Sequence, residues 1–266
     1  MENAQKLQLD ELLRSLEEWA PLSLQESYDN AGLVLGNRHG EVHRALICFD
    51  VTPQVVEEAV EKGADLIISH HPPIFKGIKR IDSNSRMGRM LALSLQHGIS
   101  WYAMHTNLDN TPTGVNSYLS QKLGLRNARA LVPADAQGLA GAGVIGSLPE
   151  PMQEKQLLDT LKELTGVRCI RHSGFAGRTI KTLALCGGSG AGFFAEAEAR
   201  QADVYITGDV KYHDFADAEN TTWLVDIGHY ESELCARRIF SRIIRERYPD
   251  LVLYFPDSEQ NPIGVV

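Results

Sequence analysis

Short apolar runs alternate with stretches of helical periodicity along most of this 266-residue chain, and this rhythm restricts the possible folds more than any other feature. Strands that alternate with helices are typical of βαβ units, whose strands form a mostly parallel sheet flanked by helices. The sequence therefore predicts an α/β fold. In the first half we expect strands at 45–49, 66–68 and 99–103 and helices at 53–62, 87–96 and 115–123.

The alternation is preceded by a helix and is interrupted once. Apolar residues recur at helical spacing from Leu9 to Trp19, and Pro21 ends this helix. The stretch 126–148 is rich in Gly and Ala, and its pattern is weaker. Beyond it we expect helices at 154–164, 193–200, 215–219 and 231–247 and strands at 182–186, 204–206, 223–226 and 251–255.

The interruption near the middle of the chain predicts two domains. We expect one α/β lobe over residues 1–125 and a second over 126–266, with no sequence repeat beyond the shared rhythm. Candidate ligands described below come from both halves. Because domain interfaces commonly hold binding sites, we place the site in the cleft between the lobes.

The charge and the cysteines exclude several classes of protein. The net charge of −8 argues against nucleic acid as a partner, because such proteins usually carry a basic excess. The polar, acidic start does not match a signal peptide, and no apolar run is long enough to span a membrane. Cysteines 48, 169, 186 and 235 form no CxxC pair, which argues against a disulfide framework. We expect a cytoplasmic protein.

Two adjacent histidines, His70 and His71, follow the strand expected at 66–68. Neighbouring residues of a strand point to opposite faces, so both imidazoles can serve one centre only where the chain turns. Pro72 and Pro73 force a stiff, extended exit that favours such a turn. The arrangement suits two metal ions with one imidazole each. The alternative is a polar strand end with solvated histidines.

His105 and Asp109 follow the next strand and are expected at the same sheet edge. Asp109 could bridge two ions through its two carboxylate oxygens. His105 is either a ligand or a nearby proton-transfer group. As an alternative, Asp109 could cap the helix that begins near Thr113.

His229 and Glu233 follow the strand expected at 223–226. Their spacing of i, i+4 places both on one face of a helix, the geometry that metal-binding helices use. Glu231 points elsewhere on a regular helix and is a poorer ligand. Ligands in open α/β sheets gather beyond the carboxyl ends of the strands, which is where all of these groups are expected.

Two further loops follow strands of the second half. In the loop 208–214, Lys211 could hold a phosphate or carboxylate and His213 could transfer protons, although an ordinary polar loop explains it equally well. The loop 187–192 lacks the spacing of a dinucleotide-binding or P-loop motif. We interpret it as a tight turn with close backbone packing.

Four of these motifs and the segment 28–33, taken in chain order, resemble the Nif-three-like dinuclear-metal family, whose members are often called type 2 homologues of GTP cyclohydrolase I. The resemblance spans nearly the whole chain. It implies two α/β lobes, a ring-shaped homohexamer and two divalent ions in the inter-lobe cleft. The implied metal ligands are His70, His71, Asp109, His229 and Glu233. The matching segments are 28–33, 69–73, 105–109, 208–213 and 228–233.

The leading functional hypothesis is a metal-dependent hydrolase of a nucleotide-like or other small polar substrate. A GTP cyclohydrolase is one candidate, and the same groups could attack a phosphodiester or an amide. Asp109 and Glu233 would bridge the ions, His105 or His213 would act as acid or base, and Lys211 would hold an anion. The ligand types admit zinc, manganese, iron, cobalt or nickel. The alternative is a non-catalytic metal-binding ring that serves as a metal chaperone or an interaction scaffold.

Overall fold

A computed structural model of the chain describes residues 7–218 and 221–266. These residues form two compact units. Unit 1 runs to Leu108 and takes in Ala236–Gln260, whereas unit 2 comprises Asp109–Cys235 and Asn261–Val266.

Unit 1 contains a five-stranded sheet in the order β1-β4-β3-β2-β11. The pairings β4-β3, β3-β2 and β2-β11 are parallel, and β1 is antiparallel to β4. The sheet is therefore mostly parallel, as its sequence rhythm predicts. Its strands are β1 (Gly32–Leu35), β2 (Arg44–Cys48), β3 (Leu66–Ser69), β4 (Ser100–Ala103) and β11 (Val252–Tyr254).

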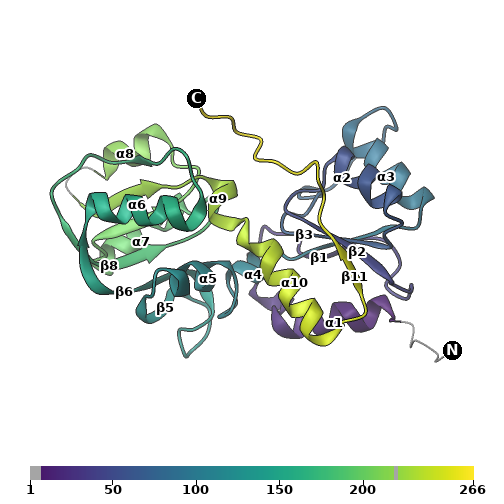
Figure 1. Ribbon diagram of the computed structural model, residues 1–266, viewed down its shortest axis with the longest axis horizontal. Coiled ribbons are helices and arrows are strands. Elements are labelled where there is room, and N and C mark those ends of the chain that lie inside the picture. The colour runs from purple at the N-terminus through teal and green to yellow at the C-terminus, as the bar shows by residue number, and fades with distance from the viewer. Residues whose placement is uncertain (1–6, 219–220) are drawn as a thin grey trace. The chain divides into compact units, whose positions relative to one another are not determined.

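Helices cover both faces of this sheet, with α2 and α3 on one side and α1 and α10 on the other (Figure 1). Leu46, Ile67 and Trp101 point toward α2 and α3 and are fully buried in one apolar cluster with them. Thr52 caps α2, because its side-chain oxygen accepts a hydrogen bond of 3.2 Å from the backbone N–H of Val55. The helices are α1 (Leu9–Trp19), η1 (Leu22–Leu24), α2 (Pro53–Glu61), α3 (Arg86–Gln96) and α10 (Cys235–Arg247), and α4 (Thr106–Asp109) follows β4.

Unit 2 contains a six-stranded sheet in the order β5-β6-β8-β9-β10-β7. Only β8-β9 and β9-β10 are parallel, whereas β5-β6, β6-β8 and β10-β7 are antiparallel. The prediction of a mostly parallel second sheet is therefore wrong. The strands are β5 (Arg126–Pro133), β6 (Gly141–Gln153), β7 (Arg171–His172), β8 (Thr179–Leu185), β9 (Val204–Thr207) and β10 (Trp223–Asp226).

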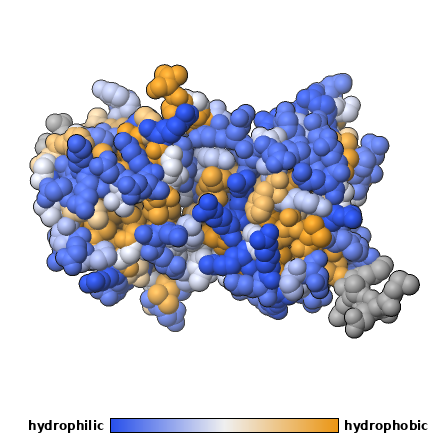
Figure 2. Space-filling view, in the orientation of Figure 1, coloured by the Kyte–Doolittle hydropathy of each residue, from blue (hydrophilic) through white to orange (hydrophobic). Residues whose placement is uncertain are grey.

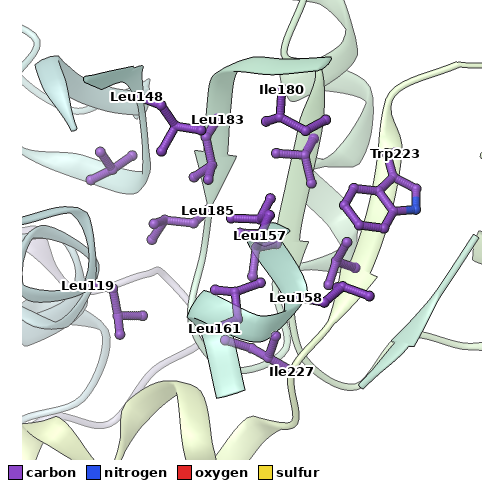
Figure 3. Close-up of a cluster of buried hydrophobic side chains, with 14 residues drawn as sticks. Leu119, Leu148, Leu157, Leu158, Leu161, Ile180, Leu183, Leu185, Trp223 and Ile227 are labelled. Carbon is purple, nitrogen blue, oxygen red and sulfur yellow. The ribbon is translucent and has the colours of Figure 1, made fainter. Parts of the chain in front are cut away.

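The core of unit 2 lies on both faces of its sheet. On one face Leu157, Leu158 and Leu161 of α6 pack against strand residues that include Leu183 and Trp223 (Figure 3). On the other face a second cluster includes residues of α7 and of the segment around α8. The helices are α5 (Val115–Lys122), α6 (Glu154–Thr165), η2 (Ala191–Phe193), α7 (Phe194–Ala199), α8 (Tyr212–Asp217) and α9 (His229–Glu233).

The antiparallel pairings come largely from a hairpin that the sequence does not predict. The Gly/Ala-rich stretch expected to be a junction forms β5 and β6. Its glycines permit close backbone approach: Gly141 has a φ of +142°, and a Cβ there would lie 2.1 Å from the carbonyl oxygen of Val132. Glycine in a strand marks such contacts, and it also hides the period-2 pattern by which a strand is recognised.

The division of the chain also differs from the boundary predicted at residue 125. Strand β11 pairs in parallel with β2, so the last helix and strand belong to unit 1 and the C-terminal half is not one continuous lobe. Asp109, expected in the first lobe, groups with unit 2. The strand and helix rhythm does not encode which sheet a given strand joins, and only the pairing reveals it.

Two predicted helices have different limits. The helix expected at 231–247 is two helices, α9 and α10, that meet at Leu234. The helix expected at 215–219 begins earlier, at Tyr212, and residue 219 lies outside the described part of the chain.

The surface shown in Figure 2 is mostly hydrophilic, with hydrophobic residues gathered in separate patches. Over residues 7–218 and 221–266, none of the helices combines the length and the apolar composition that crossing a bilayer requires.

Candidate functional site

Three imidazoles gather at the carboxyl edge of the sheet in unit 1. His70 and His71 follow β3 directly, and His105 follows β4 by two residues. The ring centroids lie 5.0 Å apart for His70 and His71, 5.4 Å for His70 and His105, and 5.2 Å for His71 and His105. Parallel neighbours end at one edge of a sheet, so the topology itself brings these rings together. We call His70, His71 and His105 the imidazole cluster.

Each ring of the imidazole cluster is held through its Nδ1 atom. Nδ1 of His70 lies 2.9 Å from the backbone oxygen of Met104. Nδ1 of His71 lies 2.8 Å from Asp50 Oδ1, and Nδ1 of His105 lies 2.7 Å from Asp29 Oδ1. Carbonyl and carboxylate oxygens only accept, so these partners assign the proton to Nδ1 and the lone pair to Nε2. Metal-ligating histidines are usually oriented in this way.

Asp29 is ionised in this arrangement. Its side chain is fully buried, which by itself would raise the pKa of the carboxyl group. Hydrogen bonds from the His105 side chain, the Thr106 hydroxyl and the backbone N–H of Asn30, with the electrostatic attraction of His105, outweigh burial and lower the pKa of Asp29 to about 2. The backbone N–H of Thr106 also donates to this carboxylate. The carboxylate therefore fixes both the ring of His105 and the start of α4.

Phe49 packs against the same cluster. Its ring stacks on His70 with a centroid distance of 5.5 Å and meets His71 edge-on at 4.5 Å. The backbone N–H of Phe49 donates to the carboxylate of Glu259, which also pairs with Arg237. This contact ties the chain leaving β2 to the C-terminal segment of unit 1.

In unit 2, His229 and Glu233 stand on one face of α9, as their spacing predicts. Nε2 of His229 lies 3.0 Å from Glu233 Oε2, and Nδ1 of His229 lies 2.7 Å from Asp209 Oδ2. Glu233 is buried, with 3% of its surface exposed. Asp209 follows β9 with a φ of +54°, a backbone conformation that turns its side chain out of the strand direction. This imidazole too is oriented by a carboxylate.

The glycine-rich loop after β8 packs closely against the carboxylate of Glu233. A Cβ on Gly188 would lie 2.1 Å from Glu233 Oε1, and the backbone N–H of Gly188 donates to Ser232 Oγ at 2.9 Å. Gly208 in the next loop donates to the backbone oxygen of Gly188 at 2.8 Å. These contacts agree with the interpretation of residues 187–192 as a closely packed turn.

Asp109 is connected to this loop through Asn116. The side-chain amide of Asn116 donates to the Asp109 backbone oxygen at 3.1 Å and accepts from the Gly187 N–H at 2.8 Å. Burial raises the pKa of the Cys186 thiol, and the negative charges of Asp109 and Glu233 raise it further. We call Asp109, His229 and Glu233 the acidic cluster.

The alternative role of Asp109, as a cap of the following helix, stays a prediction. The helix after it, α5, has Gly114 at its N-cap position, with no side-chain hydrogen bond to the cap.

Lys211 and His213 have exposed side chains at the start of α8. The backbone N–H of Lys211 donates to Asp214 Oδ2 at 2.8 Å, which is an ordinary turn contact. A role for either side chain in catalysis stays a prediction.

Three carboxylates that orient the histidines were not identified from the sequence: Asp29, Asp50 and Asp209. Two signals were available for Asp50. It closes the strand expected at 45–49, and that strand neighbours the one that ends at His70. Asp209 gave no comparable signal, because its contact depends on a left-handed backbone conformation.

The donor types of the two clusters are those that bind divalent ions. Imidazole nitrogens oriented through Nδ1, together with buried carboxylates, are the ligand types preferred by zinc, manganese and related ions. Burial raises the pKa of the Cys48 and Cys186 thiols, which favours their protonated forms.

The chain resembles known proteins over nearly its whole length. A model of the Duf34/NIF3 (NGG1p interacting factor 3) family matches residues 7–262. A Clostridium perfringens protein named GTP cyclohydrolase 1 type 2 homolog is 32% identical over 254 residues, covering 95% of this chain and 97% of that protein.

Solved structures also resemble this chain over nearly its whole length. A crystal structure of a Staphylococcus aureus hypothetical protein aligns with a TM-score of 0.88 and 30% identity over 98% of this chain and 100% of that one. A Bacillus cereus protein related to NIF3 has the same fold, with a TM-score of 0.87 at 23% identity over 97% of this chain and 99% of that one.

Proposed function

Since this chain belongs to the Duf34/NIF3 family, we propose that it is a hydrolase that depends on divalent metal ions and acts on a nucleotide-like or other small polar substrate. The ligands in this proposal are His70 and His71 of the imidazole cluster together with the acidic cluster, Asp109, His229 and Glu233. The name carried by the Clostridium perfringens relative supports a nucleotide among the substrates to be tested first.

The observation that carries the proposal is the orientation of the histidines. His70, His71 and His229 are each held through Nδ1, by a carbonyl or a carboxylate oxygen. Any buried imidazole needs a partner for its N–H, but in all three rings the partner is on the same nitrogen, Nδ1, which leaves Nε2 as the ligand atom. A ligating histidine needs this partner, because the partner sets both the tautomer and the direction of the Nε2 lone pair.

The number of donors supports two ions. A single catalytic zinc usually takes three protein ligands and keeps one position open. Five donors exceed that number, and the two carboxylates among them, Asp109 and Glu233, are the groups able to bridge. Ions bound there would polarise a scissile group and lower the pKa of a water molecule.

His105 is the candidate for proton transfer. Asp29 holds its Nδ1, and its ring lies among the imidazoles of His70 and His71, so Nε2 of His105 can accept or return a proton beside the ligands. In this proposal the exposed side chain of Lys211 attracts an anionic substrate. The exposed side chain of His213 is a second group that can transfer protons. The family resemblance further supports a ring-shaped homohexamer, which light scattering in solution would test.

The experiment is to load the purified chain with zinc or manganese, count bound metal by elemental analysis, and follow turnover of GTP and a panel of nucleotides and phosphoesters by chromatography. Asp109→Ala should lose at least one equivalent of metal without unfolding. His97→Ala, at an exposed histidine outside both clusters, serves as the matched control and should keep its metal.

Unchanged metal content in Asp109→Ala would remove Asp109 from the ligand set. Metal binding without turnover of any substrate, with several metals, would overturn the hydrolase and favour the non-catalytic metal-binding ring.

A further inference from the structure

The segment between β3 and α3, residues 72–84, carries an unusual set of exposed side chains directly after the histidine pair. Phe75 is 44% exposed and Ile81 is 70% exposed. Between them, the side chains of Lys76, Lys79 and Arg80 are exposed as well. We call residues 72–84 the β3–α3 segment.

The aromatic part of this segment adjoins the imidazole cluster. The ring of Phe75 lies 6.2 Å from the ring of Tyr28, which is 62% exposed, and 6.1 Å from the ring of His105. The side-chain amide of Asn30 donates to the backbone oxygen of Ile74 at 2.6 Å and so anchors the segment beside Tyr28. Two exposed rings therefore stand next to the proposed proton-transfer group.

The cations of the segment are not used inside the fold. With the described residues, 7–218 and 221–266, Lys76, Lys79 and Arg80 form no ion pair. The one carboxylate of the segment, Asp82, accepts from the backbone N–H of Asn84 at 2.9 Å and stabilises its own turn. Three cations within five positions, on a chain whose net charge is −8, form a local positive surface. Such a surface attracts anions.

We propose that Tyr28, Phe75 and the cations of the β3–α3 segment bind a planar aromatic ring that carries an anionic group, as a phosphorylated nucleoside does. The ring stacks on Phe75 and Tyr28, and the anionic group is held by Lys76, Lys79 or Arg80. Any flat ring can stack against an exposed aromatic side chain, whereas the cations favour ligands that carry a negative charge. This inference rests on the proposed function and specifies the class of its substrate.

The test uses the full chain freed of metal by a chelator, so that bound metal does not capture phosphate. Guanosine monophosphate, guanosine and inorganic phosphate are titrated separately by calorimetry, together with a short single-stranded RNA. The monophosphate should bind more tightly than either of its parts.

Two variants separate the ring contact from the charge contact. Phe75→Ala should weaken both guanosine and its monophosphate about tenfold, and Phe75→Tyr should restore both. The double change Lys76→Gln with Lys79→Gln should weaken the monophosphate and reduce the effect of salt, and leave guanosine unchanged.

Matched controls lie in unit 2. Phe175→Ala removes an aromatic ring that is 58% exposed, and Lys155→Gln removes an exposed lysine; neither should change any of the affinities.

The proposal would be overturned by no binding of the monophosphate to the unaltered chain, by equal affinities in Phe75→Ala and Phe175→Ala, or by tighter binding of RNA than of the monophosphate. A change of oligomeric state in Phe75→Ala without a change of affinity would also overturn it and would assign the surface to contacts between copies. The titrations are done without metal and therefore measure ligand binding alone. A failure of ligand binding is thus distinguished from a failure of the metal-dependent hydrolysis.

Discussion

Gly188 lies directly behind the carboxylate of Glu233, so close that a Cβ at this position would stand 2.1 Å from Oε1. Glu233 is buried, and its Oε2 lies 3.0 Å from Nε2 of His229. The loop therefore leaves the carboxylate one position, and that position depends on the absence of a side chain at residue 188.

Gly188→Ala is expected to displace the Glu233 carboxylate and to weaken zinc binding about 10- to 100-fold, the usual cost of disturbing a group that orients a ligand. The matched control is Gly166→Ala. Gly166 has a φ of +73°, close to the +63° of Gly188, but a Cβ there would meet nothing within 4 Å. Both changes carry the same backbone strain, so a difference in zinc affinity by calorimetry reports on Glu233. Equal affinities would rule out this role for the loop.

Asp209→Asn should also weaken zinc binding, by about 10- to 100-fold, because the amide no longer fixes the tautomer of His229 as a carboxylate does. The present contact is 2.7 Å between Asp209 Oδ2 and His229 Nδ1. Asp217→Asn, at an exposed position of α8, is the control and should bind zinc normally. The two variants should have the same thermal midpoint without metal; a large loss for Asp209→Asn would indicate a structural role instead.

Asp29 makes the stability of the metal-free chain depend on acid pH. Its folded pKa of about 2 is below the ordinary value of 3.8, so ionised Asp29 stabilises the folded state. This contribution, about 2 kcal/mol, is complete above pH 5 and is lost as the pH falls toward 2. Urea unfolding should therefore separate the original chain from Asp29→Asn at pH 6 and bring the two closer at pH 2.5. A constant difference across this range would contradict the assignment.

Metal should stabilise the folded chain. Ions that bind the folded state add about 3 kcal/mol when they are present at a hundred times their dissociation constant. Zinc should therefore raise the thermal midpoint, and a chelator should reverse the shift. In the double variant His70→Ala with Glu233→Ala the shift should shrink or disappear, whereas in His97→Ala it should persist. A shift of the same size in the double variant would place the metal elsewhere on the chain.

The sequence predicts the candidate metal ligands better than the residues that orient them. His70 and His71 could be selected because an apolar strand ends directly before them, and His229 with Glu233 because helical spacing aligns them. Asp209 could not be chosen in the same way, because a carboxylate that orients a ring is recognised by its direction in space. Helix and strand periodicity carries no such information.

The fold was predictable where the pattern is local. The elements from β2 to α5, except the short α4, follow from periodicity and breaker residues, and their limits agree to within one or two positions. The hairpin of β5 and β6 was missed because close backbone contact replaces apolar side chains with glycine and alanine. The place of β11 was missed because pairing with β2 joins residues about 200 positions apart in the chain, roughly the separation of Ala45 from Leu253.

The return of β11 to the first sheet has a consequence for biosynthesis. Unit 2 has all of its strands once residue 226 has emerged from the ribosome, whereas the sheet of unit 1 waits for Val252–Tyr254. Domains generally fold in the order in which they are made. Here the unit that begins first is completed last, and until then the edge of β2 that β11 covers is open to other strands.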